Sequence, residues 1–297
     1  MQPGSADSSI EGWRQVSDDL QDWVGSRQES EDVITLWPVQ ALHATLDLDS
    51  PRPAAGDPLP PLWHWLFFLP TVPHSGLGVD GHPERGGFLP PVPLPRRMFA
   101  GARYEFHRPL LIGDAARSVG EVVSVTEKQG ASGPLVFVLV RYEVGGKDGL
   151  SIVAEHDIVY REAPHGAPDY TRGTGPIPTA AWSRTVVPDP VMLFRYSALT
   201  FNAHRIHYDH PYVTLAEGYP GLVVHGPLTA MLLADLAGGN GPGPLKRFSF
   251  RARSPLFAGS SVTLLGDLDG DDAELAAWSH DGRLAVTATA GFGPGNL

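Results

Sequence analysis

The densest group of side chains able to do acid–base chemistry lies in the run NAHRIHYD. Asn202, His204, His207, Tyr208 and Asp209 fall within eight consecutive positions, which is more titratable and hydrogen-bonding groups than a turn requires. His207 is the candidate base, because an imidazole titrates near neutrality and can take a proton from water and later return it. The run is therefore predicted to form part of a catalytic site.

A second run, VVHGPLTAMLLADLAGG, predicts a buried helix whose first turn is marked by Gly226 and Pro227. The first N–H groups of a helix have no partner within it. Pro227 has no N–H, so the available donors are Gly226 and the residues just after Pro227. They predict a site where negative charge developing on an oxygen would be stabilised.

The two runs resemble the MaoC-like hot-dog family of R-specific enoyl-thioester hydratases and hydroxyacyl-thioester dehydratases. The family pattern places a tyrosine before the catalytic run, matched by Tyr196. It ends that run with a histidine and an acidic residue, which correspond to His207 and Asp209. Its helix begins with valine, histidine and glycine, as at His225 and Gly226.

Three positions depart from the family pattern. Asn202 stands where the family has its catalytic aspartate, His204 replaces its asparagine, and Arg205 replaces its proline. The carboxylate that normally shares the catalytic work is therefore missing from its position. This departing form, together with the upstream run RRMFAGARYEFHRPLLIGD, resembles the two-repeat subgroup that contains 3-methylfumaryl-CoA (mesaconyl-CoA) hydratases and mitochondrial-type hydroxyacyl-thioester dehydratases.

The resemblance covers most of the chain and implies an α+β double hot-dog fold, in which each repeat wraps a curved antiparallel sheet around a central helix. It implies reversible addition of water to an α,β-unsaturated acyl-CoA, foremost mesaconyl-CoA to citramalyl-CoA. The CoA thioester would be the substrate, and no cofactor is expected. Two alternatives stay open: a 3-hydroxyacyl-thioester dehydratase acting on CoA or acyl carrier protein, and a non-catalytic acyl-thioester-binding protein, which the loss of the aspartate at Asn202 allows.

In the hydratase interpretation His207 deprotonates water, Asn202 orients that water, and the Gly226 N–H holds the thioester oxygen. Asp209 is the reserve candidate for a second base or for orienting His207. The predicted substrate-binding residues are Tyr196, His204, Arg205, His225, Arg96, Arg97 and Arg103. For the arginines a solvated basic surface is the competing interpretation, since isolated arginines are common on protein surfaces.

Other site types fit the residues less well. His204, His207 and His210 recur every three residues, whereas zinc favours two histidines four apart on one helix face, so no metal is predicted. A serine hydrolase would need a G-x-S-x-G turn, which the sequence lacks. Hot-dog thioesterases use an acid on the central helix, and Asp235 lies toward the far end of that helix.

Composition bounds the remaining possibilities. The 297 residues, 42% hydrophobic and 19% charged, suit two domains of ~150 residues with a sizeable core. A net charge of −11 disfavours nonspecific binding to nucleic acid or to an anionic membrane. The chain has no cysteine, no apolar run of 18 residues and no basic, hydrophobic leader at its start. We expect a soluble cytoplasmic protein, with a homodimer as a possible assembly.

The expected organisation is a disordered segment 1–9, an N-terminal repeat 10–165 for substrate binding, a linker 166–178 and a catalytic C-terminal repeat 179–297. Predicted helices are one carrying Trp13 to Trp23 and one at 39–46. A buried strand is predicted at 62–70, followed by a long loop, 70–95, that covers the thioester site. The run FAGARYEFHRPLLIGD predicts a strand followed by a turn at Gly113 and Asp114. The other predicted strands are 118–127, 135–144, 151–160, 182–187, 246–253, 260–268, 273–279 and 283–292.

Overall fold

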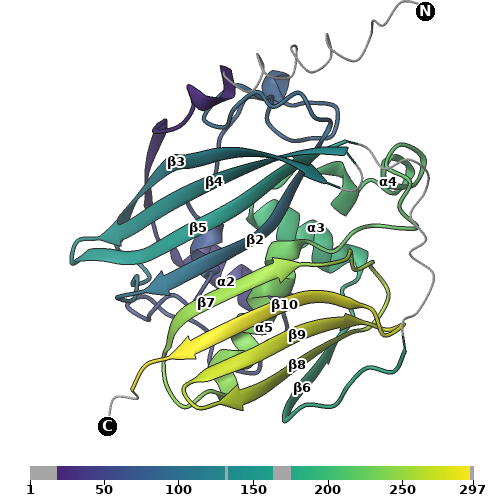
Figure 1. Ribbon diagram of the computed structural model, residues 1–297. Helices are drawn as coiled ribbons and strands as arrows, with labels where there is room; N and C mark the ends of the chain where they lie inside the picture. The colour runs from purple at the N-terminus through teal and green to yellow at the C-terminus, as the bar shows by residue number, and fades with distance from the viewer. Residues whose placement is uncertain (1–18, 131–132, 163–174, 295–297) are drawn as a thin grey trace, which may run out of the picture.

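The computed structural model describes residues 19–130, 133–162 and 175–294 (Figure 1). The predicted disordered N-terminus, most of the helix carrying Trp13 to Trp23, and residues 166–174 of the predicted linker lie outside this range. The proposed boundaries between the two repeats therefore stay a prediction.

Within the described residues, ten strands form one antiparallel sheet in the order β1-β3-β4-β5-β2-β7-β10-β9-β8-β6. The two halves of this order correspond strand for strand. Read from the outer edges inward, β6, β8, β9, β10 and β7 match β1, β3, β4, β5 and β2. The central strands β2 and β7 join the halves, with Ala102 opposite Phe250. The strands are β1 (Arg27–Val33), β2 (Arg96–Phe106), β3 (Ala115–Gly130), β4 (Gly133–Gly146), β5 (Gly149–Arg161), β6 (Trp182–Val186), β7 (Leu245–Ala252), β8 (Val262–Asp269), β9 (Asp272–Ser279) and β10 (Leu284–Phe292).

One core helix lies between β1 and β2 in the chain, and a second lies between β6 and β7, after shorter helical segments. These are α2 (Leu36–Thr45) and α5 (Gly226–Asn240), which lie behind the sheet in Figure 1. The buried residues of α5 include Leu228, Met231 and Leu232, and the alternating strands of the second half turn their apolar side chains toward it. The other helical segments are η1 (Trp63–Leu66), η2 (His74–Gly76), α3 (Pro190–Leu199), η3 (Arg205–His207) and α4 (His210–Leu215).

This architecture confirms the predicted α+β class and, within one or a few residues at most ends, the predicted helix at 39–46 and every predicted strand except 62–70. The strand predictions succeeded because period-two alternation is plain in the sequence. In β9, for example, Ala273, Leu275 and Ala277 are buried while Asp272 and Glu274 are exposed.

The predicted strand at 62–70 was wrong. Residues 63–66 form a short 3-10 helix, and Leu62 and Phe68, which flank this turn, have positive φ values of 68° and 57°. The Phe68 N–H donates to the Asp32 carboxylate rather than to a neighbouring strand. The aromatic side chains pack into the core from this turn, with Trp63 only 3% exposed. An unbroken apolar run does not by itself distinguish a buried strand from a buried turn.

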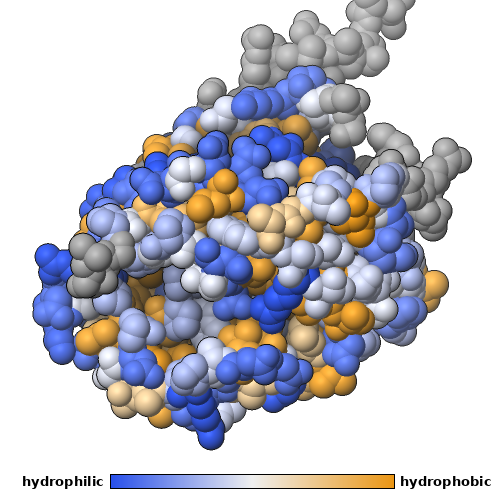
Figure 2. Space-filling model, turned by 90° about the horizontal axis from the view of Figure 1, so that it is seen from below, coloured by the Kyte–Doolittle hydropathy of each residue, from blue (hydrophilic) through white to orange (hydrophobic). Residues whose placement is uncertain are grey.

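The long loop expected after this run is confirmed: between Phe67 and Pro95 the structure has irregular backbone apart from η2. Seen from below, the surface mixes hydrophilic residues with smaller apolar patches (Figure 2). Among the described residues, none of the helices is long and apolar enough to cross a membrane.

Candidate active site

His207 is a buried imidazole with one nitrogen already committed. Its Nδ1 lies 2.7 Å from the Val223 carbonyl oxygen, and because a carbonyl can only accept, we assign the proton to Nδ1. The other nitrogen, Nε2, is then an unprotonated acceptor. The residue is 7% exposed, and burial lowers its pKa to about 4, so the ring is neutral near pH 7. These are the properties of a general base.

The ring of His225 packs against the ring of His207. The two rings stack with centroids 3.7 Å apart, and the Nε2 atom of His225 lies 2.8 Å from the Ser197 hydroxyl of α3. Burial holds the pKa of His225 well below its usual value. Tyr196 is 1% exposed, and its ring centroid lies 4.8 Å from that of His225. The Tyr196 hydroxyl donates to the Met231 sulfur. We infer that Tyr196 and His225 fix the position of His207.

Gly226 follows His225 as the first residue of α5. The first bond of the helix runs from the Thr229 N–H to the His225 carbonyl, so the Gly226 N–H precedes the hydrogen-bonded ladder. A Cβ at Gly226 would contact no heavy atom of the described structure within 4 Å, apart from its own helix and chain neighbours. The glycine therefore leaves open space beside a backbone donor at the positive end of the buried helix.

The side-chain oxygens of Asn202 and Asp209 accept hydrogen bonds from backbone N–H groups. The Asn202 Oδ1 atom accepts the His204 N–H at 3.0 Å, so this side chain holds the backbone of the motif. Asp209 caps α4 by accepting the Tyr212 N–H, and its second oxygen accepts from the Arg205 guanidinium at 2.9 and 2.7 Å. Asn202 is a neutral amide that does not take up a proton, and both Asp209 oxygens already accept from protein groups.

The predicted arginines are placed very differently from one another. Arg205 pairs with Asp209, donates to the Val79 carbonyl and lies over the Tyr212 ring. Arg96 pairs with Glu217 at 3.0 Å, and Arg103 pairs with Glu155 and Asp157 on the exposed side of β2.

Arg97 has no ion-pair partner among the described residues. It lies close enough to His82 and His204 to help lower the pKa of each, although burial is the larger cause for both. Of the predicted arginines, Arg97 thus acts electrostatically on the histidines, Arg103 pairs on the exposed side of β2, and Arg96 and Arg205 pair with acids.

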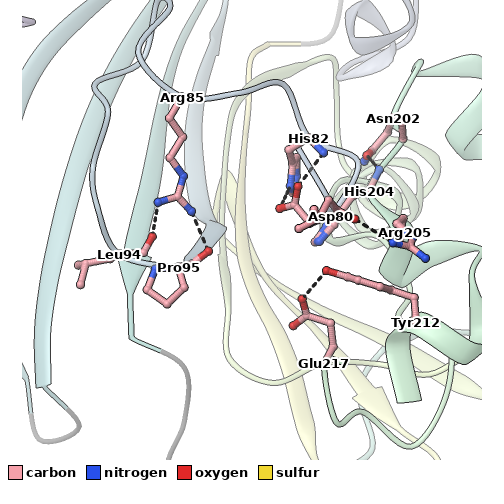
Figure 3. A network of polar contacts seen from close by, with 12 residues as sticks. Asp80, His82, Arg85, Leu94, Pro95, Asn202, His204, Arg205, Tyr212 and Glu217 are labelled. Atoms are coloured by element: carbon pink, nitrogen blue, oxygen red, sulfur yellow. Dashed lines mark hydrogen bonds and ion pairs between the residues drawn. The ribbon is translucent and has the colours of Figure 1, made fainter. Parts of the chain in front are cut away.

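Sequence reasoning missed two residues of the long loop, Asp80 and His82, which lie beside His204 (Figure 3). The His82 and His204 ring centroids are 4.0 Å apart, and the His204 ring meets the His207 ring edge-on at 5.5 Å. The available signal was an acid and a histidine two residues apart around Gly81. It was inconspicuous because the loop is 120 residues upstream of the motif.

A carboxylate oxygen of Asp80 and one nitrogen each of His82 and His204 lie within 4.8 Å of one another. Such a donor set suits zinc. The prediction that the site holds no metal is therefore still to be tested, and it now concerns this cluster rather than the spacing of the motif histidines.

A large hollow, about 750 Å³ in volume, lies elsewhere, between Arg103, Asp157, Ser249 and Thr289 on the outer side of the sheet. It does not include any of the histidines described above.

Residues 62–258 match the family model described as hydroxyacyl-thioester dehydratase type 2. The chain is 52% identical over 277 residues to the mesaconyl-C(4)-CoA hydratase of Chloroflexus aurantiacus, covering 93% of this chain and 99% of that protein.

Two solved structures show the same fold. A MaoC-like dehydratase from Phytophthora capsici superimposes with a TM-score of 0.68 at 13% identity, covering 93% of this chain and 97% of that one. A Mycobacterium tuberculosis protein described as a double hot-dog gives a TM-score of 0.55 at 15% identity, covering 92% and 97%. These similarities confirm the double hot-dog architecture. With the family model matching well over half of its length, the chain belongs to the hydroxyacyl-thioester dehydratase type 2 family, a MaoC-like group of hydro-lyases.

Proposed function

We propose that the protein catalyses the reversible hydration of a dicarboxylic enoyl-CoA of the mesaconyl-CoA type. The observation that carries the proposal is the pairing of His207, a neutral base with its Nδ1–H donated to Val223, with the open backbone donor of Gly226 at the start of α5. The activity of the 52% identical relative supports the choice of acyl group.

The proposed reaction needs only water and the unsaturated acyl chain as reactants. His207 Nε2 takes a proton from water while the water oxygen forms a bond to the β-carbon. The electron pair of the double bond moves onto the thioester oxygen, where the Gly226 N–H stabilises the enolate. The imidazolium then returns its proton to the α-carbon, so no cofactor is consumed. Loss of water reverses these steps.

The neutral state of His207 suits this role. Burial is the main cause of its lowered pKa, His82 lowers it further, and the Val223 carbonyl opposes both. A base that is unprotonated above about pH 4 is ready at neutral pH, and its stacking against the neutral His225 avoids an unfavourable pair of charges.

Arg97 is the proposed anchor for the free carboxylate of the acyl chain. Its guanidinium is without an ion-pair partner among the described residues and acts electrostatically on His82 and His204 at the site. Guanidinium binds carboxylate through two parallel hydrogen bonds, which a neutral side chain does not reproduce. This role falls to Arg97 because Arg96 and Arg205 are already paired with acids.

The test compares hydration of mesaconyl-CoA and crotonyl-CoA, followed by absorbance, in wild type and in Arg97→Gln. We expect kcat/KM for the dicarboxylic substrate to fall about 10-fold or more, the loss of one charged hydrogen bond, with a much smaller change for crotonyl-CoA. Arg103→Gln, on the same strand but paired outward, is the matched control. An equal loss on both substrates would remove Arg97 as the anchor.

The alternative substrate is a 3-hydroxyacyl thioester of fatty-acid metabolism, favoured by the family's description. A long-chain enoyl-CoA and an enoyl thioester of acyl carrier protein, assayed at the same concentration as mesaconyl-CoA, distinguish the two. Higher kcat/KM for either monocarboxylic substrate would replace the proposed function. The homodimer expected from the sequence stays a prediction, which light scattering of the purified protein tests.

A further inference from the structure

The catalytic motif supplies one proton acceptor where the reaction geometry calls for two. A water molecule attacking the β-carbon through its oxygen presents two hydrogens, and fixing its orientation takes an acceptor for each. His207 Nε2 is one acceptor. The motif position that usually carries a carboxylate is Asn202, a neutral amide whose oxygen already accepts the His204 N–H, and both oxygens of Asp209 accept from protein groups.

The long loop brings a replacement to this place and is firmly attached there. The Arg205 N–H donates to the Asp80 carbonyl at 2.9 Å, and the Arg205 guanidinium donates to the Val79 carbonyl at 2.9 Å. Gly81 packs so closely that a Cβ there would lie 1.8 Å from the Ala203 carbonyl oxygen. Residue 81 has a positive φ of 87°, so glycine satisfies both the backbone conformation and the close approach.

Within the loop, Asp80 fixes the state of His82. One carboxylate oxygen accepts the His82 backbone N–H at 3.0 Å, and the other lies 2.9 Å from the His82 Nδ1 atom. An ionised carboxylate can only accept, so Nδ1 carries the proton and Nε2 is a free acceptor. Although burial favours the neutral acid, the hydrogen bond from His82 holds the pKa of Asp80 below its usual value. Asp80 is therefore ionised and holds His82 in the tautomer whose Nε2 accepts.

The pair is also partly open to solvent. The side chains of His82 and Asp80 are 24% and 30% exposed, and the His82 ring packs on His204, which in turn contacts His207. Figure 3 shows the two loop residues alongside His204 and Asn202, which follow α3 in the chain.

We propose that His82, oriented by Asp80, is the second acceptor of the catalytic water and replaces the carboxylate that the motif has lost at Asn202. This inference rests on the proposed hydration. One water proton passes to His207 Nε2 and finally to the α-carbon. The other hydrogen stays on the oxygen, hydrogen-bonded to His82 Nε2, and becomes the hydrogen of the product hydroxyl. Asp80 is a positioning residue that acts through His82.

The first test measures turnover of His82→Ala and Asp80→Asn. Asparagine would present its NH₂ to Nδ1 and stabilise the tautomer whose Nε2 carries the proton, which turns the acceptor into a donor. We expect each variant to lose at least ~10² in kcat, within the usual range for acid–base groups, with KM changed less than about 3-fold. Because the residues act as a unit, the double variant should be no slower than His82→Ala alone.

The chain offers a matched control. Glu105 and His107 have the same acid-any-histidine spacing and lie 3.6 Å apart, but at the exposed end of β2. Glu105→Gln and His107→Ala should keep wild-type kcat. Added imidazole should restore part of the activity of His82→Ala, a rescue that a merely structural role of the ring would not give.

The second test restores the family pattern. Asn202→Asp keeps an oxygen that can accept the His204 N–H and adds a carboxylate oxygen at the position of the missing acid. If the loop pair substitutes for that acid, Asn202→Asp should recover about 10-fold or more of the kcat lost in His82→Ala.

The outcomes separate this inference from the proposed function. A wild-type protein that hydrates no enoyl-CoA would overturn the proposed function. Wild-type activity together with unchanged kcat in both His82→Ala and Asp80→Asn would overturn the role of the loop pair alone. So would equal losses in the His107→Ala control, or additive losses in the double variant.

Discussion

Replacing His207 by asparagine separates its chemistry from its contribution to the fold. The asparagine NH₂ can still donate to the Val223 carbonyl, as Nδ1 does over 2.7 Å, but it carries no base. We expect kcat to fall by ~10²–10⁴, the usual contribution of a general acid–base group. Unfolding free energy at pH 7.5 should fall by only about 1 kcal/mol, the typical value of the aromatic stacking lost with His225.

His207→Ala provides the comparison, since it removes the same base and also leaves the buried Val223 carbonyl without this partner. It should lose a further ~1–3 kcal/mol of unfolding free energy, the cost of an unsatisfied buried group. The two variants should therefore have similar kcat but different stability, measured by hydration of mesaconyl-CoA and by urea denaturation.

The same substitution has a pH signature. The unfolded chain binds a proton at His207 below its ordinary pKa of 6.5, whereas the folded protein excludes it down to about pH 4. Stability from this residue is thus complete above pH 6.5 and declines as pH falls toward 4, by about 3 kcal/mol in total. His207→Asn removes this decline, although His82, His204 and His225 around it continue to contribute theirs.

The measurement is the difference in unfolding free energy between wild type and His207→Asn from pH 7.5 to 4.5, which should shift in favour of the variant as pH falls. A difference that stays constant over this range would refute the burial argument. Wild-type kcat in either variant would refute the assignment of the base.

Three further outcomes are expected. Gly226→Ala adds a methyl group to the open space beside the proposed oxyanion donor, so kcat/KM from hydration kinetics should fall about 10-fold or more, with little change in thermal unfolding. Full activity would show that the thioester does not approach there. Arg205→Gln should lower kcat equally for mesaconyl-CoA and crotonyl-CoA, because Arg205 holds the loop bearing His82; selective loss on the dicarboxylic substrate would make it the carboxylate anchor instead. Treatment with a chelator, followed by assay and metal analysis, should leave activity unchanged; inactivation reversed by zinc would identify Asp80, His82 and His204 as metal ligands.

The sequence by itself determined the class of fold and was enough to predict the base. Period-two alternation in segments such as β9 depends on which face of a strand is buried, and this preference is local. The start of α5 was equally readable, because Gly226 and Pro227 are a local signal for the first turn of a helix. The family pattern then singled out His207, whose base-like geometry the structure supports.

Only the tertiary structure decided which residues lie around His207 and which of their atoms already have hydrogen-bond partners. Asn202 and Asp209 look like catalytic partners in the sequence, yet their oxygens hold backbone N–H groups and a guanidinium. Asp80 and His82 look like ordinary loop residues until the loop packs on Arg205. The physical reason is that a side chain's function depends on which partners fill its hydrogen-bonding capacity, and those partners lie up to 126 residues away along the chain, as Val79 does from Arg205.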